Sequence, residues 1–189
     1  MITIDDIKSF IGKKKVVLIG NSESGKEKSY RGFVKVRMNL GIYEPCDIWI
    51  NNLSANAFNE IKDLPNIHPK LIIRLNAEDN ETRLHHFPDY LKPYTYKWRF
   101  TPYHKMRGEL QLEMPTTGMS SVYWFYTNEI CKLPIYLDRY DFFQTRNRHH
   151  LRLFGDKFHG SRHNPERERL IMQEYHQQGI IKWINEQSI

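Results

Sequence analysis

Long hydrophobic runs are missing from this chain of 189 residues, and cysteine is scarce. A membrane-spanning helix needs about 20 consecutive apolar residues. No run approaches that length, so the sequence excludes a single-pass anchor. Residues 1–6 show no basic segment leading into an apolar one, and we therefore expect no secretory signal. The two cysteines, Cys46 and Cys131, are too few for a disulfide framework and are typical of a reducing compartment. Together these absences predict a cytoplasmic protein.

Internal repeats, low-complexity tracts and Gly/Ser-rich linkers are also absent, which favours one domain spanning residues 1–189. Hydrophobic residues make up 40% and aromatic residues 13%, a share too high for a disordered chain. A chain of this size buries about 70% of the surface that it exposes when unfolded, so it can form a core without metals or bridges. The net charge of +6 and the pI near 9.2 favour a polyanionic partner or a phosphate-bearing ligand, without choosing between them.

Short apolar runs rich in β-branched residues alternate with helical patterns along the chain. The run 16–19 is apolar on both faces and predicts a buried parallel strand. Asn164 and Pro165 predict the start of a helix that ends near Gly179. We expect further strands at 33–39, 47–50, 70–75, 133–137 running into 141–143, and 180–184, and further helices at 5–11, 55–64 and 119–131.

This alternation predicts an α/β fold, a single Rossmann-like domain with a mostly parallel sheet flanked by helices. The segment 76–110 gives no clear period, and we expect irregular structure or a lid there.

A turn of small residues, Gly20-Asn21-Ser22, follows the first predicted strand. Ligands of open parallel sheets bind at the carboxyl ends of the strands, where this turn lies. It matches neither the dinucleotide-binding G-x-G-x-x-G nor the P-loop pattern, and by itself it also fits plain turn chemistry. Asn39 ends the next strand and offers a donor and acceptors at the same edge, or otherwise forms a strand-ending Asx turn.

His163 directly precedes the predicted helix cap, which favours a loop position at a helix N-terminus. The helix dipole disfavours imidazolium there, so a neutral histidine can accept a proton near pH 7. The alternative is a surface histidine in a basic loop. His159, His163 and Glu168 suggest a zinc trio, but Gly160 argues against one helix carrying both histidines, and we expect no metal. Glu168 either anchors this geometry or pairs with one of the arginines 162, 167 and 169.

Four segments of the chain follow one another in an order that resembles the sialylmotifs of the animal-type sialyltransferases, which use CMP-sialic acid. The sequences V-L-I-G-N-S at 17–22 and R-M-N at 37–39 resemble the family's large motif, with its V-V-G-N-S and R-M-N. P-T-T-G-M at 115–119 resembles the small motif, P-[ST]-T-G. His163 with Glu168 matches the very-small motif, H-x-x-x-x-E, and residues 179–189 resemble the family's closing strand.

The resemblance implies a sialyltransferase-like variant of the glycosyltransferase A fold and an inverting glycosyltransferase that needs no metal or other cofactor. It would transfer sialic acid, or a related keto-sugar such as Kdo, from a CMP-activated donor to a hydroxyl of a glycan or glycoconjugate. His163 would act as the general base, with Glu168 in the same motif. An upstream histidine would assist the departing phosphate, and His149, His150 and His159 all remain open for that role.

The donor site follows from the same resemblance. Asn21 and Asn39 would contact the CMP moiety, and Gly20 and Ser22 would shape its turn. The residues that would meet the donor near its carboxylate are Thr116, Thr117 and Gly118.

The chain also departs from the family. It has no N-terminal anchor, and only Cys131 stands near a motif cysteine, so no disulfide is expected. Arg139-Tyr140 stands where the family usually has Gly-Phe-Asp. The length leaves little room for acceptor loops, which suits a short soluble bacterial or viral relative.

A basic protein that binds or modifies nucleic acid is the alternative. Aromatic residues and cations alternate from Tyr94 to Phe100 and can stack bases while neutralising phosphates. The same alternation fits a half-buried strand. The charge run 146–152 fits a solvated loop or a surface for an anionic acceptor. A third reading is an inactive relative that binds a nucleotide.

Overall fold

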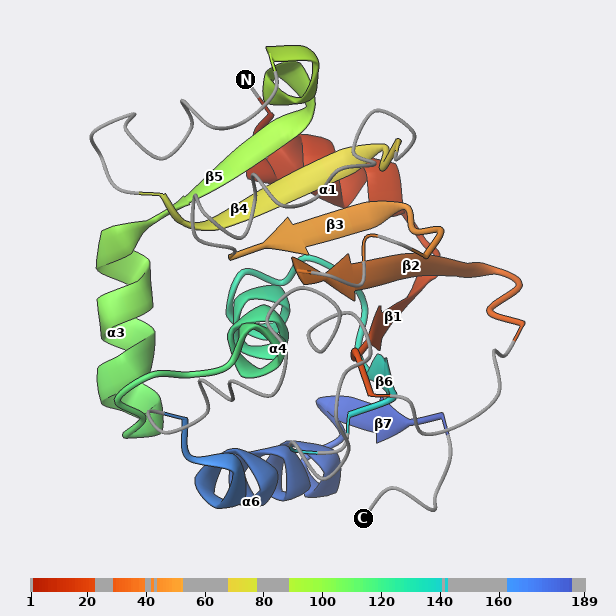
Figure 1. Ribbon diagram of the computed structural model, residues 1–189. Helices are drawn as coiled ribbons and strands as arrows, with labels where there is room; N and C mark the ends of the chain where they lie inside the picture. Colours follow the sequence, from red (N-terminus) through yellow and green to blue (C-terminus); the bar gives the residue numbers. More distant parts are fainter. Residues whose placement is uncertain are drawn as a thin grey trace.

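The fold was analysed in a computed structural model that describes residues 2–22, 29–39, 42, 44–52, 68–77, 89–140, 142 and 163–184. Seven strands form one sheet in the order β5-β4-β3-β2-β1-β6-β7 (Figure 1). Every neighbouring pair is parallel, which confirms the predicted α/β, Rossmann-like fold. The strands are β1 (Lys15–Ile19), β2 (Phe33–Met38), β3 (Ile48–Asn51), β4 (Leu71–Ala77), β5 (Thr95–Arg99), β6 (Ile135–Asp138) and β7 (Ile181–Trp183).

Local sequence explains where the helices begin and end. Thr3 and Asp6 form a capping box at the start of α1. Asn164 accepts from Arg167 N at 3.0 Å as the cap of α6, and Gly179 takes a left-handed φ of 72° after its end. The helices are α1 (Ile4–Ile11), α3 (Phe100–Leu110), α4 (Thr117–Thr127) and α6 (Pro165–Gln177), with a 3-10 helix, η4 (Asp89–Tyr94).

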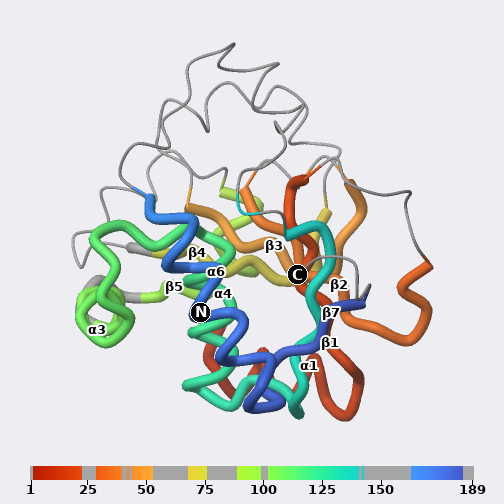
Figure 2. The backbone as a smooth tube through the Cα atoms, turned by 90° about the horizontal axis from the view of Figure 1, so that it is seen from below, coloured from red at the N-terminus to blue at the C-terminus, as the bar shows by residue number. Residues whose placement is uncertain are grey.

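The strand order reverses direction at β1. From β1 the chain adds β2 to β5 on one side of the sheet, and then returns to place β6 and β7 on the other. Figure 2 shows this division, with α3 beside β5 and β7 at the opposite side. Ligands of open α/β sheets bind at the carboxyl ends of the strands at such a reversal. The end of β1 is therefore the place in this fold where a site is expected.

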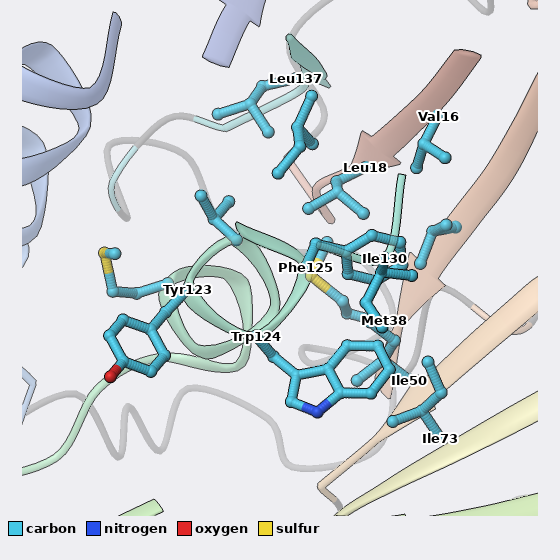
Figure 3. Close-up of a cluster of buried hydrophobic side chains, with 14 of the residues drawn as sticks. Val16, Leu18, Met38, Ile50, Ile73, Tyr123, Trp124, Phe125, Ile130 and Leu137 are labelled. Atoms are coloured by element: carbon cyan, nitrogen blue, oxygen red, sulfur yellow. The ribbon is translucent and has the colours of Figure 1, made fainter. Parts of the chain in front are cut away.

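Helix α4 packs on one face of the sheet and is buried from Met119 to Phe125. Figure 3 shows its Trp124 directed toward Ile50 and Ile73, and Phe125 toward Leu18. All five side chains are buried, and each contributes about 1.5–3 kcal/mol of hydrophobic free energy. This packing fixes the helix axis and thereby sets the first turn of α4 at the carboxyl edge of the sheet.

The segment 76–110 is more regular than predicted. Its described part forms η4, β5 and α3. Trp98 of β5 is only 3% exposed and its ring centroid lies 6.2 Å from that of Trp124, so tertiary packing orders a stretch that shows no period. The predicted half-buried strand is confirmed as β5, whereas Phe100 begins α3.

Two element boundaries also differ from the prediction. α4 ends at Thr127 rather than at residue 131, because the side-chain amide of Asn128 bonds to the carbonyl of Trp124 at 2.9 Å. β6 ends at Asp138 instead of running into 141–143, since Arg139 adopts a left-handed φ of 56°. The helix predicted at 55–64 lies outside the described residues. Cys46 and Cys131 are both free, as predicted, and no described helix is long and apolar enough to cross a membrane.

Candidate functional site

Glu168, in the first turn of α6, joins the beginnings of two helices. Its carboxylate accepts from Thr116 N at 2.7 Å and from Thr116 Oγ1 at 2.6 Å. The same Oγ1 accepts from Met119 N at 3.0 Å and so caps α4. We call the pair of Thr116 and Glu168 the latch. It connects the predicted very-small motif to the small motif, 52 residues away along the chain.

The latch carboxylate is buried among neutral donors. Glu168 is 3% exposed, and burial raises its pKa to about 7 against the opposing effect of the two Thr116 hydrogen bonds. Its predicted alternative is a pair with arginine 162, 167 or 169; no pair with Arg167 or Arg169 is seen, and residue 162 lies outside the described residues. Arg169 instead pairs with Glu166 at 2.5 Å. Glu168 thus anchors the geometry rather than balancing a cation.

His163 lies just before α6, as predicted, and one of its ring nitrogens has a defined role. Nδ1 lies 2.6 Å from the carbonyl oxygen of Met114. A carbonyl can only accept, so Nδ1 carries the hydrogen and, in the neutral ring, the lone pair is on Nε2. This is the tautomer that a general base uses when its orienting partner is bound through Nδ1.

Asn39 holds the ends of three elements together. Its Nδ2 donates to Thr117 Oγ1 at 2.9 Å, and its Oδ1 accepts from Asn52 N at 2.8 Å. Its carbonyl accepts from Trp49 Nε1 at 2.8 Å, and the residue takes a left-handed φ of 46°. Because both ends of the amide are engaged, Asn39 organises the edge, and a contact with CMP would have to share these groups.

Asn21 differs from Asn39 in having a vacant acceptor. Its Nδ2 donates to the carbonyl of Met38 at 3.1 Å, which ties the turn after β1 to the end of β2. Its Oδ1 is buried, and within the described part of the chain it has no donor. A buried amide oxygen without a donor costs about 1–3 kcal/mol, so this atom is the best-defined position for a ligand donor. Ser22, the next residue, is also buried.

Tyr140 is a site residue that the sequence analysis noticed only as a departure from the family pattern. A Cβ on Gly118 would lie 2.8 Å from its ring, and a Cβ on Gly20 would lie 3.2 Å from the ring and 2.1 Å from the carbonyl of Arg139. Both motif glycines therefore make room for this neighbour. Burial raises the pKa of Tyr140, with a contribution from the carboxylate of Glu168, so the ring also lies near the latch.

A second charged group lies at the other face of the sheet, and no pattern in the sequence indicated that its members come together. The carboxylate of Glu44 contacts Arg37 Nη2 at 2.5 Å and Arg139 Nη1 at 3.2 Å. Beside it, Tyr30 donates a hydrogen bond to Asp138. Burial lowers the pKa of Arg37, Glu44 counters this, and the neighbouring Arg139 lowers it further.

No family model, curated protein or solved structure matches this chain. The identification of the site therefore depends on its geometry and on the motif resemblance.

The remaining predicted residues are His149, His150 and His159, which lie outside the described residues, so their role stays a prediction. Within the described ranges, no three His, Cys, Asp or Glu side chains come together in a group that could hold a metal ion.

Proposed function

We propose that this protein is a metal-independent, inverting glycosyltransferase that moves sialic acid, or a related keto-sugar such as Kdo, from a CMP-activated donor to an acceptor hydroxyl. One observation carries the proposal. Three hydrogen bonds link the motif segments across 17, 78 and 52 residues of sequence: Asn21 to Met38, Asn39 to Thr117, and Thr116 to Glu168. Segments chosen for their resemblance to sialylmotifs thus assemble at one edge, at the strand reversal where a donor would bind.

His163 is the general base in this proposal. Nε2 removes the proton from the acceptor hydroxyl, while Met114 holds Nδ1–H at 2.6 Å. The acceptor oxygen attacks the anomeric carbon as the bond from that carbon to the phosphate oxygen breaks. CMP leaves with the electron pair, and the configuration at the anomeric carbon inverts. A positioned base contributes about 10²- to 10⁴-fold in rate.

The donor is held at the beginning of α4 and at the turn after β1. Backbone N–H groups in the first turn of a helix lack acceptors within the helix, so those of Thr117 and Gly118 offer donors to an anion such as the sugar carboxylate. Oδ1 of Asn21 offers an acceptor for the amino group of cytosine.

The nucleic-acid alternative is less well supported by the structure. Two of the rings that would stack bases, those of Tyr96 and Trp98, pack against the core instead, whereas Tyr94 is exposed. Trp98 is 3% exposed, and Tyr96 packs with its ring centroid 5.6 Å from that of Trp124.

A thermal-shift assay separates these functions. The protein is melted with CMP, CDP, AMP or a short oligonucleotide. CMP-selective stabilisation of a few degrees supports the transferase, and transfer to a panel of glycan acceptors then distinguishes an enzyme from an inactive nucleotide-binding relative. Salt-sensitive oligonucleotide binding without an effect of CMP contradicts the proposal.

A further inference from the structure

Two guanidinium groups, one buried and one largely buried, flank the end of β1 on the face opposite α4. Arg37 of β2 and Asp138 of β6 are the two cross-strand neighbours of Ile19, the last residue of β1. Arg139 follows Asp138 directly, and Glu44, from the segment after β2, reaches both arginines. The group therefore lies at the strand reversal, beside the turn Gly20-Asn21.

The two arginines share one carboxylate unequally. Glu44 contacts Arg37 at 2.5 Å, whereas Arg139 Nη1 lies 3.2 and 3.4 Å from its two oxygens. Arg37 is 2% and Arg139 11% exposed, so neither charge is well hydrated. In the described structure Glu44 is the only hydrogen-bond partner that the geometry gives the Arg139 guanidinium, and the Nε atoms of both arginines are buried without an acceptor. Arg139, which has the longer contacts to Glu44 and the greater exposure, is the more weakly held of the two cations.

The carboxylates near Arg139 do not exclude a phosphate from its guanidinium. Asp138 adds a second carboxylate, but Tyr30 donates a hydrogen bond to it, and burial and this bond raise the pKa of the Tyr30 hydroxyl. Among the described residues, the carboxylates of Glu44 and Asp138 lie beside the two guanidinium groups. A phosphate would therefore compete with Glu44 for Arg139 and leave Glu44 to Arg37, its closer partner.

The backbone of Arg139 is held in an unusual conformation next to the motif turn. Arg139 has a left-handed φ of 56°, which costs free energy for a residue with a side chain, so the surrounding contacts must hold it there. Gly20 N donates to the carbonyl of Asp138 at 2.8 Å, and Gly20 leaves no space for a Cβ beside the carbonyl of Arg139. Arg139 is therefore positioned together with the turn Gly20-Asn21-Ser22, which is predicted to approach the nucleotide.

We propose that Arg139, at the end of β1, binds the phosphate of the donor nucleotide in place of Glu44, which then stays with Arg37. The inference rests on the proposed function and deepens it. A guanidinium can donate two parallel hydrogen bonds to a phosphate. It also stabilises the negative charge that CMP gains when the bond to the sugar breaks, without a divalent ion.

The test compares a nucleotide with its nucleoside. Calorimetry measures the affinities of CMP, AMP and cytidine for the wild type and for the variant Arg139→Gln. We expect Arg139→Gln to lose about 10- to 100-fold in CMP affinity and to leave cytidine affinity unchanged, because it loses charged hydrogen bonds to phosphate alone. The matched control is Lys14→Gln, which removes one exposed charge at the amino end of β1 and should leave the ratio of CMP to cytidine affinity unchanged.

Glu44→Gln separates ligand binding from a merely structural ion pair. If Arg139 and Glu44 only stabilise the fold, both variants melt at lower temperature and the ratio of CMP to cytidine affinity stays constant in each. The proposal predicts that the ratio of CMP to cytidine affinity changes in opposite directions in the two variants. The ratio falls in Arg139→Gln and rises in Glu44→Gln, because the competing carboxylate is gone. Arg139→Lys, which keeps the charge but loses the bidentate geometry, should give an intermediate ratio and serves if Arg139→Gln does not fold.

The outcomes distinguish the two proposals. A wild type that prefers CMP to cytidine, with the same preference in Arg139→Gln, overturns the role of Arg139 and leaves the transferase standing. Equal binding of CMP and AMP that is lost in Arg139→Gln supports the phosphate site and contradicts the CMP-specific donor.

Discussion

On the face of the sheet covered by α4, the carboxyl edge carries a buried carboxylate, that of Glu168, held by neutral donors from Thr116. On the opposite face, the same edge carries two guanidiniums, one buried and one largely buried, that share the carboxylate of Glu44. In the first arrangement burial raises the pKa of the Glu168 carboxyl. In the second, the Nε atoms of Arg37 and Arg139 are buried without an acceptor among the described residues. The difference suggests a division of labour, with proton transfer next to the latch and anion binding on the other side of β1.

The largest expected effect concerns the latch side. His163→Ala should retain CMP binding and lose about 10²- to 10⁴-fold in transfer rate, because it removes the base without touching the donor site. Transfer assays and calorimetry measure the two quantities. His176→Ala is the matched control, since that histidine also lies in or beside α6 and also contacts a carbonyl, that of Ile181, at 3.3 Å. Equal transfer by His163→Ala and the wild type would remove His163 from the mechanism.

The turn that joins the two sides should be the most sensitive to added volume. Gly20→Ala places a methyl group 2.1 Å from the backbone carbonyl of Arg139, where no side chain can move aside. We expect a loss of about 3 kcal/mol or more in the free energy of unfolding, measured with urea. Gly108→Ala is the control, because its Cβ meets nothing within 4 Å inside α3, and alanine there should stabilise by about 0.5–1 kcal/mol. A tolerated Gly20→Ala would contradict the tight contact.

The buried carboxylate of the latch should make stability depend on pH. Burial raises the pKa of Glu168 from 4.5 to about 7, so the folded protein binds this proton more tightly than the unfolded chain. The free energy of unfolding therefore falls as pH rises through this window, by about 1.4 kcal/mol per unit of pKa difference and by up to about 3 kcal/mol in total. Glu168→Gln keeps the shape and lacks the titration.

Urea unfolding at pH 5 and pH 8 checks this. The stability of Glu168→Gln relative to the wild type should be greater at pH 8 than at pH 5. The control is Glu166→Gln, which changes an exposed carboxylate two residues away, paired with Arg169, and should show no such gain. Parallel pH profiles for the wild type and Glu168→Gln would show that the carboxylate is not protonated near neutrality.

The smallest effect concerns the hydrogen bond between β2 and α4. Thr117→Val removes the acceptor of Asn39 Nδ2 and should cost about 1 kcal/mol of unfolding free energy. Thr127→Val, at the exposed end of the same helix, should stay within about 0.5 kcal/mol. Equal effects at both ends would mean that Asn39 does not tie the two elements together.

Much of the fold could be predicted because its signals are local. The apolar run 16–19 indicated β1, and Asn164, Pro165 and Gly179 bounded α6 within a residue. α3 was missed, and β5 was only one of two interpretations of the alternation from Tyr94 to Phe100, because Trp98 and Met106 become ordered by packing in the core, which spacing within a few residues does not reveal.

The candidate site could be predicted in part. Gly20, Asn21, Asn39, Thr116, Thr117, Gly118 and Glu168 were singled out, and the structure places them in or beside the same hydrogen-bonded edge. What each of them contacts could not be predicted. Asn39 was expected to face CMP, yet its amide bonds to Thr117 and Asn52.

By itself the sequence determined that this chain is an α/β protein with a glycine turn after its first strand, because strand runs, caps and turn residues act over a few neighbouring positions. Only the tertiary structure decided that Tyr140 occupies the space left by Gly20 and Gly118, and that Glu44 reaches Arg139, 95 residues away. Such contacts depend on the order of strands in the sheet. β2 and β6 lie on either side of β1, and this arrangement brings their ends to one place.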